Sequence, residues 1–255
     1  MSALVGRTVL LTGASSGVGR HLAAVVAAAG ANVVCCARRE GELASLVDEI
    51  AAAGGTALAQ RCDVADAASI RAAYDAAEAA FGTVDSVIAN AGINHAGPAH
   101  SLSVEDLDRI LSVNLRGAFL TAQEGAKRMI ASGPPTADRP RRIVFIASIL
   151  GRRPDLGTAV YSATKSGVLM LAKALALEWA RHAIAVNALL PGYMPTDIVG
   201  DWFATDKGKA QIASWPRQRL MPVAALDPAL LFLLSPEAEA VSGAELVIDD
   251  TQSLG

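Results

Sequence analysis

Cysteine is scarce in this chain, and no stretch of it is apolar enough to cross a membrane. Its three cysteines, Cys35, Cys36 and Cys62, lie in β-like runs. This is typical of small buried side chains and not of a disulfide framework or a metal site. No uninterrupted apolar run approaches the ~20 residues that span a bilayer, and the first residues lack the basic segment and cleavage site of a signal peptide. We expect a soluble, cytoplasmic protein with no metal and no membrane partner.

Neither sign of charge is in excess. The chain has 22 Lys and Arg against 25 Asp and Glu, a formal net charge of -3. Nucleic acid and anionic membranes attract proteins with a basic excess, which is lacking here. With 255 residues, 52% of them hydrophobic, there is ample material for a core. The composition predicts a globular protein that does not bind nucleic acid.

Short apolar runs alternate with longer helical stretches along the whole chain, which is typical of a parallel sheet covered on both faces. The expected strands are Thr8–Thr12, Asn32–Ala37, Ala57–Gln60, Ser86–Ala89, Ile143–Ser148, Ala183–Leu190 and Glu245–Ile248. The expected helices are Gly17–Ala29, Glu42–Ala53, Ala67–Phe81, Val104–Ile130 and Ser162–Arg181. Right-handed crossovers then give an α/β fold, a doubly wound Rossmann-type sheet of about seven strands. No break in composition divides residues 1–255, so we expect a single domain.

Two segments do not fit the alternation. Ser132–Arg142 is rich in proline and charge and is expected to be a solvated loop. Tyr193–Pro222 carries Trp202, Phe203, Trp215 and Met221 among polar residues, and we interpret it as a segment that covers a pocket. The alternative is an ordinary pair of packed helices.

A glycine-rich turn joins the first strand to the first helix. It reads Thr12-Gly-Ala-Ser-Ser-Gly-Val-Gly19. Glycines allow a tight turn and let backbone N–H groups approach a pyrophosphate, and the helix N-terminus adds partial positive charge. The strand before it and the helix after it are the context that this function requires.

The spacing Gly13-x-x-x-Gly17-x-Gly19 resembles that of the short-chain dehydrogenase/reductase family, in its branch of roughly 250 residues that includes 3-oxoacyl reductases. The resemblance spans nearly the whole chain. It implies a nicotinamide cofactor whose phosphates lie on the turn. The residues of the turn expected to contact it are Gly13, Ser15, Ser16, Gly17, Val18 and Gly19.

The end of the second strand favours NADP(H) over NAD(H). Dinucleotide folds that prefer NAD place an acidic residue there, to bind the ribose hydroxyls. This chain has Ala37, followed by Arg38 and Arg39. An arginine can bind a 2′-phosphate and stack on adenine, and Arg38 is the better candidate. Two solvated arginines at a helix entry are the alternative.

Two further elements match the family's cofactor site. Asp63-Val64 follows the third strand, and in the family this pair contacts the adenine ring; alone, Asp63 could equally cap the next helix. Asn90-Ala91-Gly92 follows the fourth strand and resembles the family's Asn-Ala-Gly element. The resemblance implies that Asn90 braces the sheet and that the main chain of the element passes the adenosine ribose.

Tyr161 and Lys165 are the candidates for proton transfer. Their spacing of four places both side chains on one face of a helix. A phenol with the ordinary pKa of ~10 exchanges protons poorly at neutral pH, and a nearby ammonium favours the phenolate. Ser148 ends a strand 13 residues earlier, the family's interval, and its hydroxyl can bind the substrate oxygen.

Two more motifs complete the resemblance. Asn114, in a long helical stretch, matches the family's fourth catalytic residue, which bends the helix and holds a water that links the lysine to a proton relay. Pro191-Gly192-Tyr-Met194-Pro-Thr196 resembles the family's Pro-Gly-x-x-x-Thr. The backbone near Met194 would bind the nicotinamide carboxamide, and Thr196 the carboxamide or the pyrophosphate.

These motifs predict an NADP(H)-dependent oxidoreductase that interconverts a ketone and a secondary alcohol. The aromatic and Met221 side chains of the covering segment suggest a moderately apolar substrate; a 3-oxoacyl thioester reductase and a sugar or polyol dehydrogenase remain open. A cofactor-binding regulatory protein is the alternative from another class. Relatives of this length are commonly tetramers, so a homo-oligomer, tetramer or dimer, is expected.

Other polar residues carry weaker hypotheses. His95 could border the substrate pocket or face solvent. Arg152 and Arg153 follow Ser148 and could contact an acidic substrate or face solvent. His21 and His182 show no spacing typical of a metal site.

Overall fold

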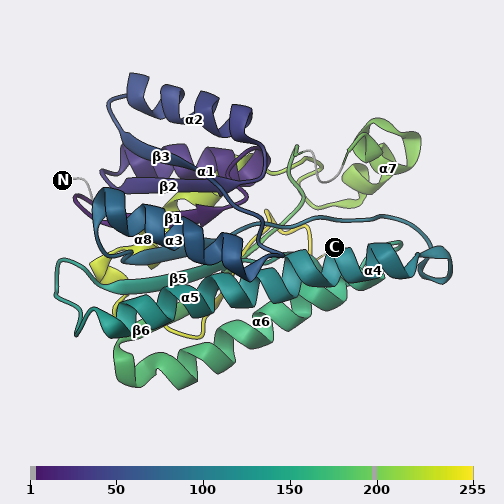
Figure 1. Cartoon of the computed structure of the whole chain (residues 1–255). Helices are drawn as coiled ribbons and strands as arrows, with labels where there is room; N and C mark the ends of the chain where they lie inside the picture. The colour runs from purple at the N-terminus through teal and green to yellow at the C-terminus, as the bar shows by residue number, and fades with distance from the viewer. Residues whose placement is uncertain (1–3, 197–199, 255) are drawn as a thin grey trace.

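One parallel sheet organises the chain. A computed structural model describes residues 4–196 and 200–254. Within these ranges, seven parallel strands lie in the order β3-β2-β1-β4-β5-β6-β7 (Figure 1). Their bounds are β1 Thr8–Thr12, β2 Asn32–Ala37, β3 Thr56–Arg61, β4 Ser86–Ala89, β5 Arg141–Ile146, β6 Ile184–Pro191 and β7 Glu245–Ile248. The order reverses at β1, as in a doubly wound sheet. The predicted fold class is therefore confirmed.

Helices cover both faces of this sheet. One apolar cluster joins the strands to α1 (Gly17–Ala28), α2 (Glu40–Ala52) and α8 (Asp227–Leu234). A second cluster joins them to α3 (Ala67–Phe81), α5 (Ala118–Ala131) and α6 (Ala159–Trp179). Alternate side chains of a strand point to opposite faces, so Val9 and Leu11 of β1 enter the first cluster and Leu10 enters the second. This explains why the inner strands carry apolar side chains on both faces of the sheet.

Several predicted boundaries change in ways that affect function. The predicted helix Val104–Ile130 is interrupted: α4 (Val104–Leu111) and α5 flank a π-helical segment, Ser112–Gly117. Strand β5 ends at Ile146, so Ser148 lies beyond it and begins a short helical turn. Helix α6 begins at Ala159 and not at Ser162. Tyr161 therefore lies in the first turn of the same helix that carries Lys165.

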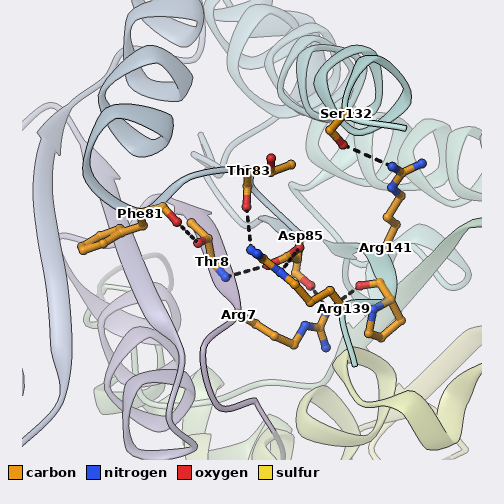
Figure 2. Close-up of polar contacts among 10 residues, drawn as sticks. Arg7, Thr8, Phe81, Thr83, Asp85, Ser132, Arg139 and Arg141 are labelled. Carbon is orange, nitrogen blue, oxygen red and sulfur yellow. Dashed lines mark hydrogen bonds and ion pairs between the residues drawn. The ribbon is translucent and has the colours of Figure 1, made fainter. Parts of the chain in front are cut away.

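The predicted solvated loop Ser132–Arg142 is wrong at its end, where Arg141 and Arg142 form the start of β5 and are buried. Arg139, just before them, binds both carboxylate oxygens of Asp85, with Nε–Oδ1 at 3.0 Å and Nη2–Oδ2 at 2.7 Å (Figure 2). Asp85 also accepts a hydrogen bond from the Thr8 backbone N–H at 2.9 Å. Burial of the Asp85 carboxylate is tolerated because both of its oxygens have hydrogen-bonding partners.

Arg7 completes this cluster at the amino ends of the strands. Its guanidinium is buried and donates to the Pro140 carbonyl at 2.7 Å, to the Leu234 carbonyl and to the Ser86 hydroxyl. Loss of solvation lowers the pKa of Arg7 to about 10. The cluster ties β1, β4, β5 and the end of α8 together on the edge of the sheet opposite to the carboxyl ends of the strands.

The segment Tyr193–Pro222 contains a short helical turn, Trp202–Ala204, and helix α7 (Asp206–Ser214). Figure 1 shows α7 set apart from the helices that cover the sheet. Phe203 and Trp215 pack on Tyr193, each with ring centroids 5.3 Å from the tyrosine ring. Met221 is instead buried in the apolar core beside α8, and it does not line the cavity beside Tyr161.

The three cysteines are buried and free, as expected of small hydrophobic side chains. Among residues 4–196 and 200–254, no helix is both long and apolar enough to span a membrane.

Candidate active site

Two adjoining cavities lie at the carboxyl ends of the strands, where doubly wound sheets bind ligands. The first, the tyrosine cavity, is lined by Ser148, Tyr161 and Lys165, together with the segment from Pro191 to Thr196. The second, the arginine cavity, is lined by Arg38, Arg39 and Asp63. The two share Ser16, Gly92 and Asn94 in their walls. An extended dinucleotide can therefore reach from one into the other.

The predicted cofactor residues all line one of these cavities. The tyrosine cavity takes Ser16, Gly17, Val18, Gly19, Asn90, Gly92, Tyr161, Lys165, Pro191, Gly192, Met194 and Thr196. The arginine cavity takes Gly13, Ser15, Ser16, Arg38, Arg39, Asp63, Val64, Ala91 and Gly92. The catalytic candidate Asn114 is buried and lines neither cavity.

The glycine turn is built so that only glycine fits at two of its positions. Gly13 has a φ of +74°, and a Cβ there would lie 2.8 Å from the Ala91 Cα. A Cβ on Gly19 would lie 2.1 Å from the Gly13 carbonyl oxygen. Their absence lets the turn pack tightly against the start of α1, where free backbone N–H groups and the helix dipole favour a phosphate. The residues present thus fit a dinucleotide.

Both arginines border the arginine cavity, but they differ in their contacts. Arg39 reaches back to the glycine turn, where its Nη2 donates to the Ser15 hydroxyl at 3.0 Å and to the Ser16 hydroxyl at 2.7 Å. Arg38 is exposed at the rim. Ala37 ends β2 beside them and contributes no charge. Two positive charges therefore lie near the end of β2, and the last residue of that strand, Ala37, is uncharged.

The Asp63-Val64 and Asn90-Ala91-Gly92 motifs hold the loops after β3 and β4 through hydrogen bonds. Asp63 accepts from the Ala65 N–H at 3.0 Å within its own loop, while Asp66 caps α3. The alternative that Asp63 caps this helix is therefore wrong. Asn90 Nδ2 donates to the Thr12 carbonyl at 3.0 Å and so braces β4 against β1.

Ser148, Tyr161 and Lys165 converge in the tyrosine cavity. Ser148 lies beyond β5 and Tyr161 in the first turn of α6, and both line the cavity, where the Ser148 side chain acts to lower the pKa of Tyr161. Lys165 Nζ lies 5.6 Å from the centre of the Tyr161 ring and donates to the Ile146 carbonyl at 2.8 Å. One face of α6 thus presents a phenol and an amine beside a serine hydroxyl.

Burial dominates the ionisation of both groups in the free protein. It raises the pKa of Tyr161 to about 12, against a smaller lowering by Ser148. It lowers the pKa of Lys165 to about 8. Tyr161 therefore holds its proton at neutral pH, while Lys165 stands near the point at which it can release one.

Asn114 lies in the π-helical segment, and its side chain explains the interruption. Its Oδ1 accepts from the Ile93 N–H at 2.8 Å, and its Nδ2 donates to the Ile93 carbonyl at 2.8 Å. Nδ2 also lies 3.3 Å from the Thr164 hydroxyl. The wider turn carries the amide to the loop after β4, one residue from Gly92 in the cavity wall.

The Pro191-Gly192 element is held by a residue that sequence reasoning missed. Gln252 is buried; its Oε1 accepts from the Tyr193 N–H at 2.6 Å, and its Nε2 donates to the Tyr193 carbonyl at 3.1 Å. Both contacts span 59 positions. A glutamine in a C-terminal tail carries no local sign of this role.

Comparison with known proteins agrees with this geometry. The family model described as short chain dehydrogenase matches residues 7–207. The chain belongs to the short-chain dehydrogenase family.

Relatives of this short-chain dehydrogenase act on alcohols of several kinds. It is 36% identical over 252 residues to a 2,5-dichloro-2,5-cyclohexadiene-1,4-diol dehydrogenase of Sphingobium indicum, covering 99% of this chain and 98% of the relative. It is 34% identical to a D-threitol dehydrogenase of Mycolicibacterium smegmatis, covering 96% and 92%. A gluconate 5-dehydrogenase from Burkholderia cenocepacia, solved with NADP and tartrate, superposes with a TM-score of 0.92 at 33% identity, covering 100% and 98%. The chain is thus an oxidoreductase for alcohol- or ketone-type substrates that uses a nicotinamide cofactor.

The other polar residues of this short-chain dehydrogenase that were considered as substrate contacts do not line the tyrosine cavity. His95 faces Asp106 with Nδ1 and Oδ2 3.6 Å apart. Arg152 pairs with Glu245, while Arg153 donates to the Ser253 carbonyl at 2.9 Å. His21 joins α1 to Asp227 at 2.7 Å. In the described part of the chain, no group of three or more His, Cys, Asp or Glu side chains could hold a metal ion.

Proposed function

We propose that this protein is an NADP(H)-dependent oxidoreductase that interconverts a ketone and a secondary alcohol, with Tyr161 as the acid and base. The convergence of Ser148, Tyr161 and Lys165 in one cavity supports this most directly. That cavity adjoins a second one with two arginines in its wall. The nicotinamide end of one cofactor would lie in the tyrosine cavity, and its 2′-phosphate would lie in the arginine cavity.

The residues of the chain divide the chemistry among them. Bound NADPH supplies a hydride to the carbonyl carbon. The Ser148 hydroxyl orients and polarises the carbonyl oxygen, and Tyr161 gives its proton to that oxygen. Lys165 stabilises the phenolate that remains and would bind the ribose of the nicotinamide cofactor. Asn114 fixes the loop after β4 and so holds the cavity wall beside Lys165.

The preference for NADP(H) rests on charge. Arg38 and Arg39 favour a 2′-phosphate, and Ala37 provides no carboxylate to repel it or to bind free ribose hydroxyls. Since Arg39 is bonded to Ser15 and Ser16, Arg38 is the arginine with the greater freedom to pair with the phosphate.

The segment 193–222 and the assembly of the chain are part of the same proposal. We infer that α7 and the turn before it close over the substrate, since Tyr193 connects them to the tyrosine cavity.

On the outside of α6, Met170 and Leu177 are 63% and 82% exposed. Such exposed apolar side chains support a homo-oligomer, which light scattering can measure.

A screen of ketones and secondary alcohols with NADPH and with NADH tests the function. We expect turnover of at least one alcohol–ketone pair, with a higher kcat/KM for NADPH than for NADH. Activity with NADH alone would contradict the role of Arg38. Cofactor binding with no turnover of any substrate would favour the regulatory alternative.

A further inference from the structure

The two ends of the covering segment, residues 193–222, meet at the side chain of Gln252. At one end, its Oε1 accepts from the Tyr193 N–H at 2.6 Å and its Nε2 donates to the Tyr193 carbonyl at 3.1 Å. At the other end, Nε2 donates to the Arg219 carbonyl at 3.2 Å, and the Met221 N–H donates directly to the Tyr193 carbonyl at 3.0 Å. The nitrogen of a primary amide carries two hydrogens, so both hydrogens and the oxygen bind backbone of the covering segment.

Gly192 lets this amide reach the backbone. A Cβ on Gly192 would lie 2.3 Å from Gln252 Oε1 and 2.8 Å from the Asp249 Cα. Carbon atoms pack best at about 3.5–4.0 Å, so any larger residue would push the C-terminal tail away from Tyr193. The contact between the tail and this backbone therefore depends on the glycine.

The tail that carries Gln252 is fixed by contacts of its own. Asp249 Oδ1 accepts from the Thr251 N–H at 3.1 Å, and Asp250 Oδ2 pairs with Arg219 Nε at 2.7 Å. Asp250 and Thr251 have φ of +53° and +68°, a left-handed conformation that is costly for residues other than glycine. Such backbone persists where the surrounding structure holds it. The tail thus presents the Gln252 amide in a fixed position.

Tyr193 begins the stretch of backbone that leads into the tyrosine cavity. Met194 and Thr196 follow it and line that cavity, and Met194 is buried. Gln252 itself lines neither the tyrosine cavity nor the arginine cavity. Any effect of Gln252 on a cofactor must therefore act through the backbone of Tyr193.

We propose that Gln252 is a positioning residue for the nicotinamide end of the cofactor. Its amide fixes the Tyr193 backbone, and thereby the Met194 backbone that would bind the nicotinamide carboxamide. Backbone groups that are already in place bind a ligand without the cost of ordering them. The inference rests on the proposed function and adds a residue that this function requires. Gln252 does not contact the glycine turn or the arginine cavity, so its effect is confined to one end of the cofactor.

Two ligands that differ in the nicotinamide half test this in Gln252→Met, which keeps the length of the side chain and removes its hydrogen bonds. NADPH has both halves, whereas adenosine 2′,5′-bisphosphate has only the adenosine and its 2′-phosphate. By calorimetry, we expect the Kd for NADPH to rise at least about tenfold, because three backbone hydrogen bonds are lost. The Kd for the bisphosphate should stay within about twofold, since distant sites without shared partners act independently. Equal changes for the two ligands, or no change for NADPH, would overturn the proposal.

Gln252→Glu makes the hydrogen bonding depend on pH. The ionised carboxylate can still accept from the Tyr193 N–H, but its second oxygen faces the Tyr193 and Arg219 carbonyls, which are also acceptors. Protonation restores a donor, and burial raises the pKa of a carboxyl group. Relative to the wild type at the same pH, the affinity for NADPH should therefore be at least about fivefold higher at about pH 6.5 than at about pH 8.5. An equal deficit at both pH values would overturn the proposal.

Asn187→Asp is the matched control. Asn187 is a buried amide that donates to the Val241 carbonyl at 2.8 Å and accepts from the Ala244 N–H at 3.0 Å. Its acidic variant should lose thermal stability as Gln252→Glu does, while the ratio of the two Kd values stays within about twofold of the wild type. A control that changes this ratio as much as Gln252→Glu would mean that lost stability alone explains the effect, which would overturn the proposal.

The same measurements separate this inference from the proposed function. A wild-type protein that binds NADPH and turns over no ketone or alcohol would contradict the oxidoreductase mechanism alone. Equal losses of both ligands in Gln252→Met, made in a protein that does reduce ketones, would contradict the role of Gln252 alone.

Discussion

Lys165 is held where an ammonium group is costly to bury. Its side chain is 5% exposed, and burial lowers its pKa to about 8 from an ordinary value of 10.5. The unfolded chain therefore binds a proton between pH 8 and 10.5 that the folded chain has released. The free energy of unfolding therefore rises with pH between pH 8 and 10.5. Below pH 8, burial of the Lys165 ammonium destabilises the folded chain to its full extent.

Replacing Lys165 by methionine should accordingly stabilise the protein while abolishing catalysis. At about pH 7 we expect the free energy of unfolding to increase by about 1–3 kcal/mol, the lost bond to Ile146 offsetting part of the gain. The difference should shrink by about pH 9.5, below the pKa of Tyr161. Urea unfolding at the two pH values measures it; a variant less stable at both would contradict this account of the lysine.

At the residue scale, functional side chains that are close in sequence could be predicted, whereas those whose contacts span many positions could not. Tyr161 and Lys165 were predictable because four positions on a helix fix their relation. Gln252 and Asp155 were not, because their contacts to Tyr193 span 59 and 38 positions. The sequence placed Arg38 and Arg39 side by side, yet only the fold shows that Arg39 turns back to Ser15 and Ser16.

At the scale of elements, the interrupted helix between α4 and α5 is the main departure from the expected pattern. Its apolar periodicity predicts one helix, and only the family resemblance implied a bend at Asn114. The π-helical turn there depends on the Ile93 backbone, which belongs to another segment. The start of β5 shows the same limit. Arg141 and Arg142 look solvated in sequence, but partners at the amino edge of the sheet allow their burial.

Asn114→Ala should damage both stability and turnover. Two hydrogen bonds to Ile93 would be lost, which costs about 1–3 kcal/mol, and the loop beside Gly92 would lose its anchor. We expect kcat to fall by about tenfold or more at a temperature where the variant is folded.

Asn187→Ala is the matched control for this experiment. Asn187 is a buried asparagine with an equivalent pair of bonds, to the Val241 carbonyl at 2.8 Å and from the Ala244 N–H at 3.0 Å, within β6. It should lose similar stability with little change in kcat. Equal loss of kcat in both variants would mean that Asn114 has a structural role only.

At the scale of the whole molecule, the sheet places two cavities side by side along one edge. The alternation of apolar runs and helices predicted this architecture, because buried parallel strands and covering helices each have a distinct period. The position of α7 could not be predicted from the sequence, since it lies in the long connection between β6 and β7 and depends on the packing of the flanking Phe203 and Trp215 rings on Tyr193.

Ala37→Asp tests whether the arginine cavity selects the cofactor. A carboxylate at the end of β2 would repel a 2′-phosphate and bind free ribose hydroxyls. We expect the ratio of kcat/KM for NADPH to that for NADH to fall at least about 30-fold, the equivalent of about 2 kcal/mol. Ala53→Asp, at the exposed end of α2, adds the same charge away from the cavity and should leave the ratio unchanged. An unchanged ratio in Ala37→Asp would contradict this assignment of the cavity.

The most direct measurement of the central claim is the rate of ketone reduction by Tyr161→Phe with saturating NADPH. The account predicts that kcat falls by about a thousandfold, as expected for loss of a general acid, while the affinity for NADPH stays within a few-fold. Tyr74→Phe, which removes only a buried bond to the Thr121 carbonyl, should keep its kcat. A Tyr161→Phe enzyme that reduces the ketone at the wild-type rate would contradict the account.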